Sequence, residues 1–259
     1  MDLLHVVAGL LVGVIVGMTG VGGGSLMAPA LILVFGVAPT TAVGTDLWFA
    51  AITKSVGGAI HHRMGGADFA IVRRLCYGSL PASLVTAWFV LGTDMHQIKS
   101  GLIMHALGIV LLLTAVATLF RNRIQAANRS VNVETAQRFV RWQPVLTVVA
   151  GAVLGAMVTL TSVGAGALGA TMLLTLYPLQ MTTRKLVGTD IVHAVPLTFL
   201  AGLSHLWAGN VNGLLLGNLL LGSIPGIVAG SLLANRVSNR VLQPMLALVL
   251  AFAGYRLLA

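Results

Sequence analysis

Apolar residues run almost without interruption over most of this chain, and short polar turns separate the runs. Six runs are each near the ~20 residues that a helix needs to cross the hydrocarbon core of a bilayer, and they occupy residues 44–60, 73–91, 100–119, 186–206, 213–233 and 241–258. A helix satisfies its own backbone hydrogen bonds, which lipid cannot do. The pattern therefore predicts an all-α polytopic membrane protein with six full spans.

Two further apolar stretches, 3–36 and 144–178, are each interrupted by a glycine-rich segment that leaves arms of about 13–18 residues. At a rise of 1.5 Å per residue, an arm of about 13 residues covers only ~20 Å, which is less than the ~30 Å of the hydrocarbon core. Each stretch is therefore expected to form a glycine-broken helical hairpin that enters and leaves the membrane on the same side. The alternative is a pair of ordinary, tilted spans in each stretch.

The chain contains two copies of one pattern. The sequence Val-Gly-Thr-Asp occurs at 43–46 and 187–190, and Gly-Ser-x-Pro occurs at 78–81 and 222–225, in both cases 144 residues apart. Hydrophobic repeats with a glycine-broken segment in each half indicate a transporter whose substrate site lies between the halves. We divide the chain accordingly into an N-terminal transmembrane repeat, a basic linker and a C-terminal transmembrane repeat, at residues 1–119, 120–143 and 144–259.

The basic residues predict how the spans are oriented. Short cytoplasmic loops retain Lys and Arg, and the linker carries five arginines against one glutamate, so we place it in the cytoplasm. The turns around Arg74 and Lys185 then also lie inside, provided that each glycine-broken stretch returns to its own side. Each half has three full spans, an odd number, so the two halves become inverted-topology repeats. Both ends of the chain are then expected outside the cytoplasm.

The composition of the chain is that of a protein embedded in a lipid bilayer. Hydrophobic residues make up 57% of the chain and charged residues 8%, with a mean hydropathy of +0.96, whereas soluble domains have about 25% charged residues. The net charge is +9, but the basic residues lie between apolar segments, so no nucleic-acid partner is expected. The single cysteine, Cys76, excludes an intramolecular disulfide. We expect neither a cofactor nor a metal site, since His61 and His62 alone are too few ligands.

The two glycine-rich segments are candidate anion-binding elements. In lipid an irregular backbone must lie inside protein or line a wet cavity, and free N–H groups at the start of the following helix suit an anion. We expect Ser25 or a neighbouring residue to cap the helix after the first segment. The alternative is that the glycines only allow close helix packing. The candidate residues are Thr19, Gly22, Gly23, Gly24 and Ser25 in the first half and Thr161, Ser162, Gly164 and Gly166 in the second.

Lys54 is the candidate residue for attracting the anion. It lies ten residues after Gly44 on a predicted span, roughly 15 Å deep by helical rise, where its side chain reaches neither surface easily. A lysine at that depth is costly and is by default functional. The alternative is a structural ion pair with an acidic residue. The matching position in the second half is Thr198, so the two halves differ here.

Asp46, Asp190 and His193 are the candidate residues for coupling transport to protons. Intramembrane carboxylates and histidines carry protons in pumps and transporters, and His193 lies on the same predicted helix as Asp190. Both carboxylates also lie near the starts of matched predicted helices, where a negative charge stabilises the first turn by roughly 0.3–1 kcal/mol. A structural role through the helix dipole is therefore the alternative.

Taken together, these motifs resemble the sulfite exporter TauE/SafE family, also called the 4-toluene sulfonate uptake permeases. The resemblance covers nearly the whole chain apart from the linker, and it adds a histidine-containing turn with a glycine four residues on in each half. It implies a permease of the bacterial inner membrane that moves sulfite, sulfonates or related organosulfur anions. The repeated motifs of the family then include, in this chain, Gly22, Gly23, Gly24, Thr45 and Asp46, with Gly164, Gly166, Thr189 and Asp190.

The leading interpretation is a secondary transporter for a small anion, and not an enzyme. An anion channel would use the same site, and the sequence does not separate the two. An intramembrane protease would want Gly-x-Ser-Gly, but Ser25 is followed by Leu26. No phosphate-binding loop for ATP is present, so transport driven by ATP hydrolysis in this chain alone is not expected. The sequence leaves open the anion, the direction, the coupling ion and whether the chain forms a homo-oligomer.

Overall fold

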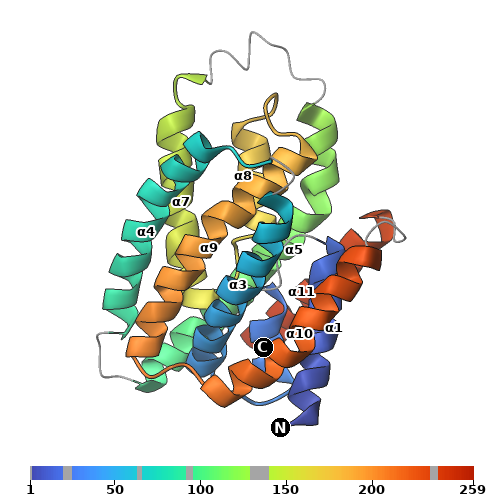
Figure 1. The fold of residues 1–259 in the computed structure, drawn as a ribbon. Coiled ribbons are helices and arrows are strands. Elements are labelled where there is room, and N and C mark those ends of the chain that lie inside the picture. The colour runs from blue at the N-terminus through green and yellow to red at the C-terminus, as the bar shows by residue number, and fades with distance from the viewer. Residues whose placement is uncertain (1, 20–24, 63–65, 92–95, 129–139, 234–238) are drawn as a thin grey trace.

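The chain folds into a bundle of α-helices in the computed structural model (Figure 1). The structure describes residues 2–19, 25–62, 66–91, 96–128, 140–233 and 239–259, and these ranges contain no β-strand. The helices of the N-terminal half are α1 (Leu3–Thr19), α2 (Met27–Leu33), α3 (Pro39–His62), α4 (Phe69–Leu91) and α5 (His96–Asn128). Those of the C-terminal half are α7 (Gln143–Thr161), α8 (Ala167–Leu176), α9 (Thr183–Trp207), α10 (Gly213–Leu233) and α11 (Asn239–Leu258).

Each of the six predicted spans falls within one helix, namely α3, α4, α5, α9, α10 or α11. In the described part of the chain, length and composition alone mark four segments as able to cross a membrane, at Ser100–Ala127, Gln143–Thr161, Arg184–Trp207 and Gly213–Leu233. The predicted all-α, multi-pass membrane fold is confirmed at this level. One boundary differs, because α5 continues as helix to Asn128, so the first part of the predicted linker is helical.

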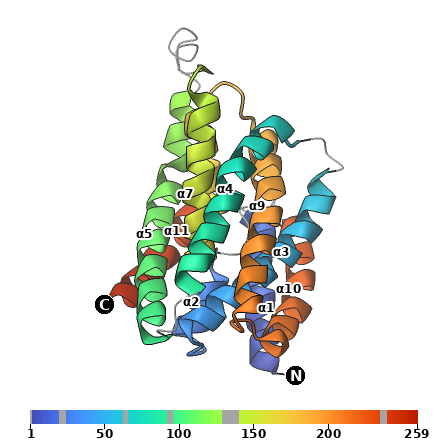
Figure 2. The ribbon, with the colours of Figure 1, turned by 90° about the vertical axis from the view of Figure 1, so that its left-hand side faces the viewer.

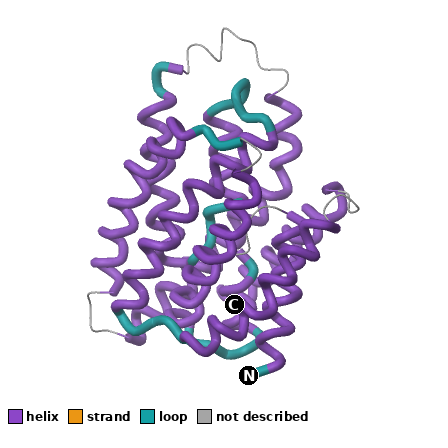
Figure 3. Tube along the Cα trace, viewed as in Figure 1, coloured by secondary structure: helices purple, strands orange, loops and turns teal. Residues whose placement is uncertain are grey.

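The two glycine-broken stretches each form one long and one short helix. The second stretch has 19 residues in α7 and 10 in α8, and α8 at a rise of 1.5 Å per residue covers only about 15 Å. The start of α7 and the end of α8 lie at the same end of the bundle (Figure 1). The first stretch has 17 residues in α1 and 7 in α2, and it lies at the opposite end, beside the N-terminus (Figure 2). Loops between the described helices are short (Figure 3).

Each helix contact between the two halves joins a helix of one half to a helix of the other, and corresponding helices make corresponding contacts. The long arm α1 packs on α10, and its counterpart α7 packs on α4, while α3 pairs with α9 and α5 with α11. Matching helices also run in opposite directions: α1, α3 and α5 run upward in Figure 1, and α7, α9 and α11 run downward. Each half therefore completes its packing only with helices of the other half.

The glycine of the repeated Gly-Ser-x-Pro motif allows this close packing. A Cβ atom on Gly78 of α4 would overlap the Val148 carbonyl of α7, and one on Gly222 of α10 would overlap the Val6 carbonyl of α1. The pairs correspond, since Val6 and Val148 lie at matching places in the two long arms. Backbones that approach this closely have no room for a side chain, as at other helix contacts in lipid.

Two leucine-rich clusters pack around α8 and fix its position. One cluster joins it to α5, α7 and α11 and includes Leu107, Leu111, Leu154, Leu168 and Leu250. The other joins it to α4 and α9 and includes Ile71, Leu75, Leu173, Tyr177 and Leu186. The outer surface carries large exposed apolar side chains such as Trp88, Leu248 and Phe252. Such a surface is suited to lipid rather than water.

Gly222→Ala is expected to destabilise the bundle, because the new methyl group meets the Val6 backbone carbonyl and overpacking costs about 1–3 kcal/mol. Gly217→Ala on the same helix is the matched control, since nothing lies within 4 Å of its Cβ position. The melting temperature of each variant is measured by thermal unfolding in detergent, with size-exclusion chromatography as the readout. Equal melting temperatures for the two variants would contradict the packing described above.

Candidate functional site

The break between α7 and α8 is a buried turn that only a few residue types can make. Ser162 has φ 60°, Gly164 φ 122° and Gly166 φ 146°, a region of the backbone map that favours glycine. The Thr161 hydroxyl donates to the Met157 carbonyl at 2.7 Å and accepts from the Val163 N–H at 3.1 Å. All residues from 161 to 170 are buried. The second tip, residues 161–166, is thus an irregular backbone enclosed by protein, as membrane depth requires.

The far end of α8 is held by polar side chains. The Tyr177 hydroxyl lies 2.7 Å from the Thr147 Oγ1 and accepts from the Arg74 Nη1 at 3.3 Å. Gln143 Nε2 donates to the Leu176 carbonyl at 2.9 Å. These bonds connect α8 to α4 and α7, so the second tip sits on a hairpin fixed at its base.

The first tip is described only at its edges, because Gly22, Gly23 and Gly24 lie outside the described residues. Thr19 ends α1, and Ser25 precedes α2. The N-cap residue of α2 is Leu26, which is adjacent to Ser25, and no side-chain cap hydrogen bond forms there. A carboxylate from α3 takes this role, since the Asp46 Oδ2 accepts from the Ala28 N–H at 3.3 Å.

Asp46 connects the first tip with the second. It is 0% exposed, and besides the start of α2 its carboxylate faces the Ser162 side chain of the second tip. The Asp46 Oδ1 and the Ser162 Oγ have no hydrogen-bond partner within 3.5 Å among the described residues. Unsatisfied buried oxygens are costly, and in native proteins they are usually occupied by a water, an ion or a ligand.

Lys54 lies at the second tip. Its Nζ donates to the Ala165 carbonyl at 2.6 Å, and the residue is 5% exposed. The ammonium attracts the carboxylates of Asp46 and Asp190 electrostatically, but it forms no direct ion pair among the described residues. Lys54 is therefore buried within the protein, and its hydrogen-bond partner is a backbone carbonyl.

Asp190 faces the start of α8 as Asp46 faces the start of α2. A Cβ atom on Gly169 would overlap the Asp190 Oδ1, so this carboxylate lies against the first turn of α8. Asp190 is 6% exposed and attracts both Lys54 and Arg121. His193 is buried one turn further along α9, and its Nε2 lies 2.9 Å from the Ser79 Oγ. The structure thus brings together Lys54, Asp46, Asp190 and the second tip, with His193 close by.

The threonine of each Val-Gly-Thr-Asp motif accepts a hydrogen bond from a loop of the other half. Thr45 Oγ1 accepts from the Asn212 N–H at 3.1 Å, and Thr189 Oγ1 accepts from the Asp68 N–H at 3.0 Å. Asn212 and Asp68 in turn cap α10 and α4 through their side-chain oxygens. These reciprocal bonds hold the start of each carboxylate-bearing helix in place.

The two reciprocal loops differ in charge. Asp68 forms an ion pair with Lys185 at 2.8 Å, whereas its counterpart Asn212 is neutral. Partial burial raises the pKa of Asp68, but the Lys185 ammonium and the N–H groups of Ile71 and Ala70 outweigh this effect and hold the pKa below its usual value. The pair is therefore ionised at neutral pH.

Sequence reasoning missed two polar residues of this region. Arg121 was assigned to the linker, yet the helix α5 reaches past it and its charge acts on Asp190. The signal was its spacing from Thr114 and Thr118, which places the three on one helical face. Ser79 belongs to the repeated Gly-Ser-x-Pro motif, but its contact with His193 crosses 114 residues of sequence.

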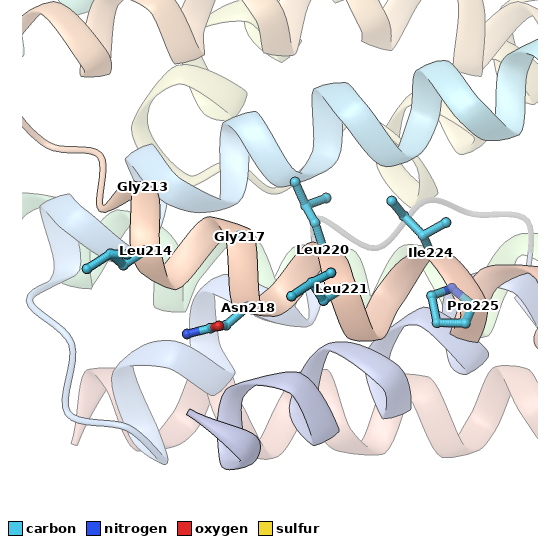
Figure 4. A pocket seen from close by; sticks show the side chains of 8 residues that line it. All are labelled: Gly213, Leu214, Gly217, Asn218, Leu220, Leu221, Ile224 and Pro225. Atoms are coloured by element: carbon cyan, nitrogen blue, oxygen red, sulfur yellow. The ribbon is translucent and has the colours of Figure 1, made fainter. Parts of the chain in front are cut away.

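A hollow on the outer face of α10 is separate from these residues (Figure 4). Its described lining includes Gly213, Gly217, Leu221, Ile224 and Pro225, with the Asn218 amide as the polar group. It offers no cation to an anion. Among the described residues, no group of three or more His, Cys, Asp or Glu side chains is placed to hold a metal ion.

An apolar helical bundle that encloses charged side chains between two broken helices is the arrangement of a polytopic membrane transporter. The chain belongs to the sulfite exporter TauE/SafE family, whose model matches residues 5–257. This confirms the family resemblance predicted from the repeated motifs.

The relatives are named as transporters. The chain is 40% identical to the probable membrane transporter protein YjnA of Bacillus subtilis (strain 168), over 100% of both chains. It is 26% identical to the probable membrane transporter protein YdhB of the same organism, over 99% of this chain and 100% of the relative. No solved structure matches the chain.

Thr189→Val is expected to lower stability by about 1 kcal/mol, because the Asp68 N–H loses its acceptor. Thr198→Val is the matched control on the same helix: Thr198 is equally buried, but its hydroxyl donates only within α9. Thermal unfolding in detergent distinguishes the two. If Thr198→Val is as unstable as Thr189→Val, the hydrogen bond from Asp68 to Thr189 contributes no more to stability than a hydrogen bond within α9.

Proposed function

We propose that this protein is a secondary transporter for a small anion, namely sulfite, a sulfonate or a related organosulfur anion, and that it couples transport to protons. It works in the bacterial inner membrane with the 120–143 region on the cytoplasmic side. The observation that carries the proposal is the buried Lys54, whose Nζ is bound to the Ala165 carbonyl of a broken helix. Family membership supports the transporter class.

The ammonium of Lys54 has capacity left for an anion. A lysine has three N–H donors, and the Ala165 carbonyl uses one of them. A charge at this depth is kept only where it serves a function or a partner, and no carboxylate pairs with it directly among the described residues. The remaining donors suit the oxygens of a sulfite or sulfonate group.

The carboxylates at the two short helices supply a route for proton coupling. The start of a helix favours a negative charge, and Asp46 and Asp190 occupy these places at α2 and α8. An incoming anion competes with the carboxylate for the positive end of the same short helix. A proton that neutralises the carboxylate lowers this competition, so anion and proton bind best together. That linkage favours their transport in the same direction.

Inverted repeats supply the motion in this proposal. The opposite directions of matching helices (Figure 1) and the mirrored packing of α1 on α10 and α7 on α4 support two inverted-topology repeats. In transporters built this way, one repeat unit moves against the other around a fixed site near the membrane centre. The two tips, which Asp46 brings together, then form that site.

Lys54→Ala is expected to reduce uptake to the level of empty liposomes, because the ammonium that attracts the anion is lost. The assay uses purified protein in liposomes and labelled sulfite, thiosulfate and methanesulfonate. Arg256→Gln is the control, since this exposed cation lies in the last turn of α11. Uptake by folded Lys54→Ala at the rate of the unmodified protein would sink the proposed site.

Asp190→Asn is expected to abolish accumulation driven by a proton gradient while leaving exchange of labelled for unlabelled anion across the membrane. The amide cannot carry a proton, but it leaves Lys54 and the second tip intact. Asp68→Asn is the control, because that carboxylate lies in a surface loop and the amide can still cap α4. Gradient-driven accumulation that survives in Asp190→Asn would exclude Asp190 as the coupling residue.

A further inference from the structure

Arg121 lies on the buried face of α5. Thr114 and Thr118 of this face are buried, and Ile124, three residues after Arg121, packs against the cluster around α8. The neighbours Leu119, Phe120 and Arg123 are exposed on the other side of the helix. Residues three and four apart share a helical face, so Arg121 is aimed into the bundle like Thr118.

The guanidinium of Arg121 attracts the Asp190 carboxylate, as the ammonium of Lys54 does. Asp190 is attracted by both cations, and it forms no direct ion pair with either among the described residues. Nor does any described residue form a hydrogen bond with the Arg121 guanidinium, so its five N–H donors remain open to another acceptor. Two acidic and two basic side chains therefore act on one another in this region, namely Asp46, Lys54, Asp190 and Arg121.

The solvent exposure of these four residues rises from Asp46 to Arg121. Asp46 is 0% exposed, Lys54 5% and Asp190 6%, and Arg121 is partly exposed. Arg121 is seven residues before the last residue of α5, Asn128. The end of α5 and the start of α7 lie at the same end of the bundle (Figure 1), which is the end that the basic residues place in the cytoplasm. Arg121 is therefore the most exposed of these four charged residues.

We propose that Arg121 is a second anion-binding residue, at the cytoplasmic mouth of the site, which holds the substrate beside Asp190 before or after it contacts Lys54. The inference rests on the proposed transport function and extends it to a residue and a substrate class. A guanidinium presents two parallel N–H donors that fit two oxygens of one group. The site then prefers oxyanions with an SO₃ group to spherical anions such as chloride.

The test uses charge replacement at position 121. In a Cys76→Ser background, Arg121→Cys and Arg123→Cys are labelled in detergent with a cationic or a neutral methanethiosulfonate reagent and then reconstituted. Labelled sulfite uptake is measured, with unlabelled chloride as competitor. Arg123 is the matched control because it lies on the same helix, is exposed and stacks over the Phe120 ring at 5.6 Å.

We expect Arg121→Cys to raise the KM for sulfite by about ten-fold or more, as for loss of a bidentate contact. The cationic reagent is expected to bring the KM for sulfite most of the way back to the parent value, and the neutral reagent is not. A residue with only a structural role would not respond to the charge of the label in this way. Arg123→Cys behaves as its parent throughout. Arg121→Cys with the parent's KM, or equal rescue by both reagents, would overturn the inference.

Two further outcomes are decisive. If Arg121→Cys does not fold, Arg121→Lys replaces it, and its expected result is a raised KM for sulfite because the forked contact is lost; an unchanged KM overturns the inference. A parent protein that moves neither sulfite, thiosulfate nor methanesulfonate overturns the proposed function and this inference together. If the parent protein transports sulfite but the KM of Arg121→Cys does not depend on the charge of the label, the inference alone is overturned.

Discussion

The structure depends on how a single buried ammonium is satisfied inside an apolar bundle. Lys54 belongs to α3 of the first half, and the carbonyl that binds it, Ala165, belongs to the break between α7 and α8 of the second half. An unbroken helix would have no such carbonyl free, since each would be bonded within the helix. The glycines of the second tip are thus needed twice: they turn the chain, and they expose the acceptor that the lysine requires.

The repeated Val-Gly-Thr-Asp motif divides three tasks among neighbouring residues. Gly44 and Gly188 let a loop of the other half approach, since a Cβ there would meet the backbone at Asn210 and Gly66. The threonine binds a loop N–H, and the aspartate turns to the start of a short helix. The motif therefore connects each half to the other, and a change in one residue disturbs both a packing contact and the site beside it.

The sequence was sufficient to predict the structural features that follow from the lengths and spacing of the apolar runs. Apolar runs predicted helices, and each of the six predicted runs lies within one helix of the structure. Partners were out of reach, because they are set by how distant helices pack: the Ala165 carbonyl is 111 residues from Lys54. The residue types indicated a cap at or beside Ser25, but the side chain that accepts the Ala28 N–H is Asp46, which is 18 residues away. Arg121 was misplaced because a helix can continue beyond its apolar run.

The two halves share a framework but not its charges. The loop that donates an N–H to Thr189 contains Asp68, which forms an ion pair with Lys185, whereas the loop that donates to Thr45 has the neutral Asn212. Ions in solution screen exposed charges and leave neutral hydrogen bonds nearly untouched. Salt therefore weakens the Asp68–Lys185 contact and leaves the Asn212 contact nearly unchanged, so the two ends of the bundle respond differently to ionic strength.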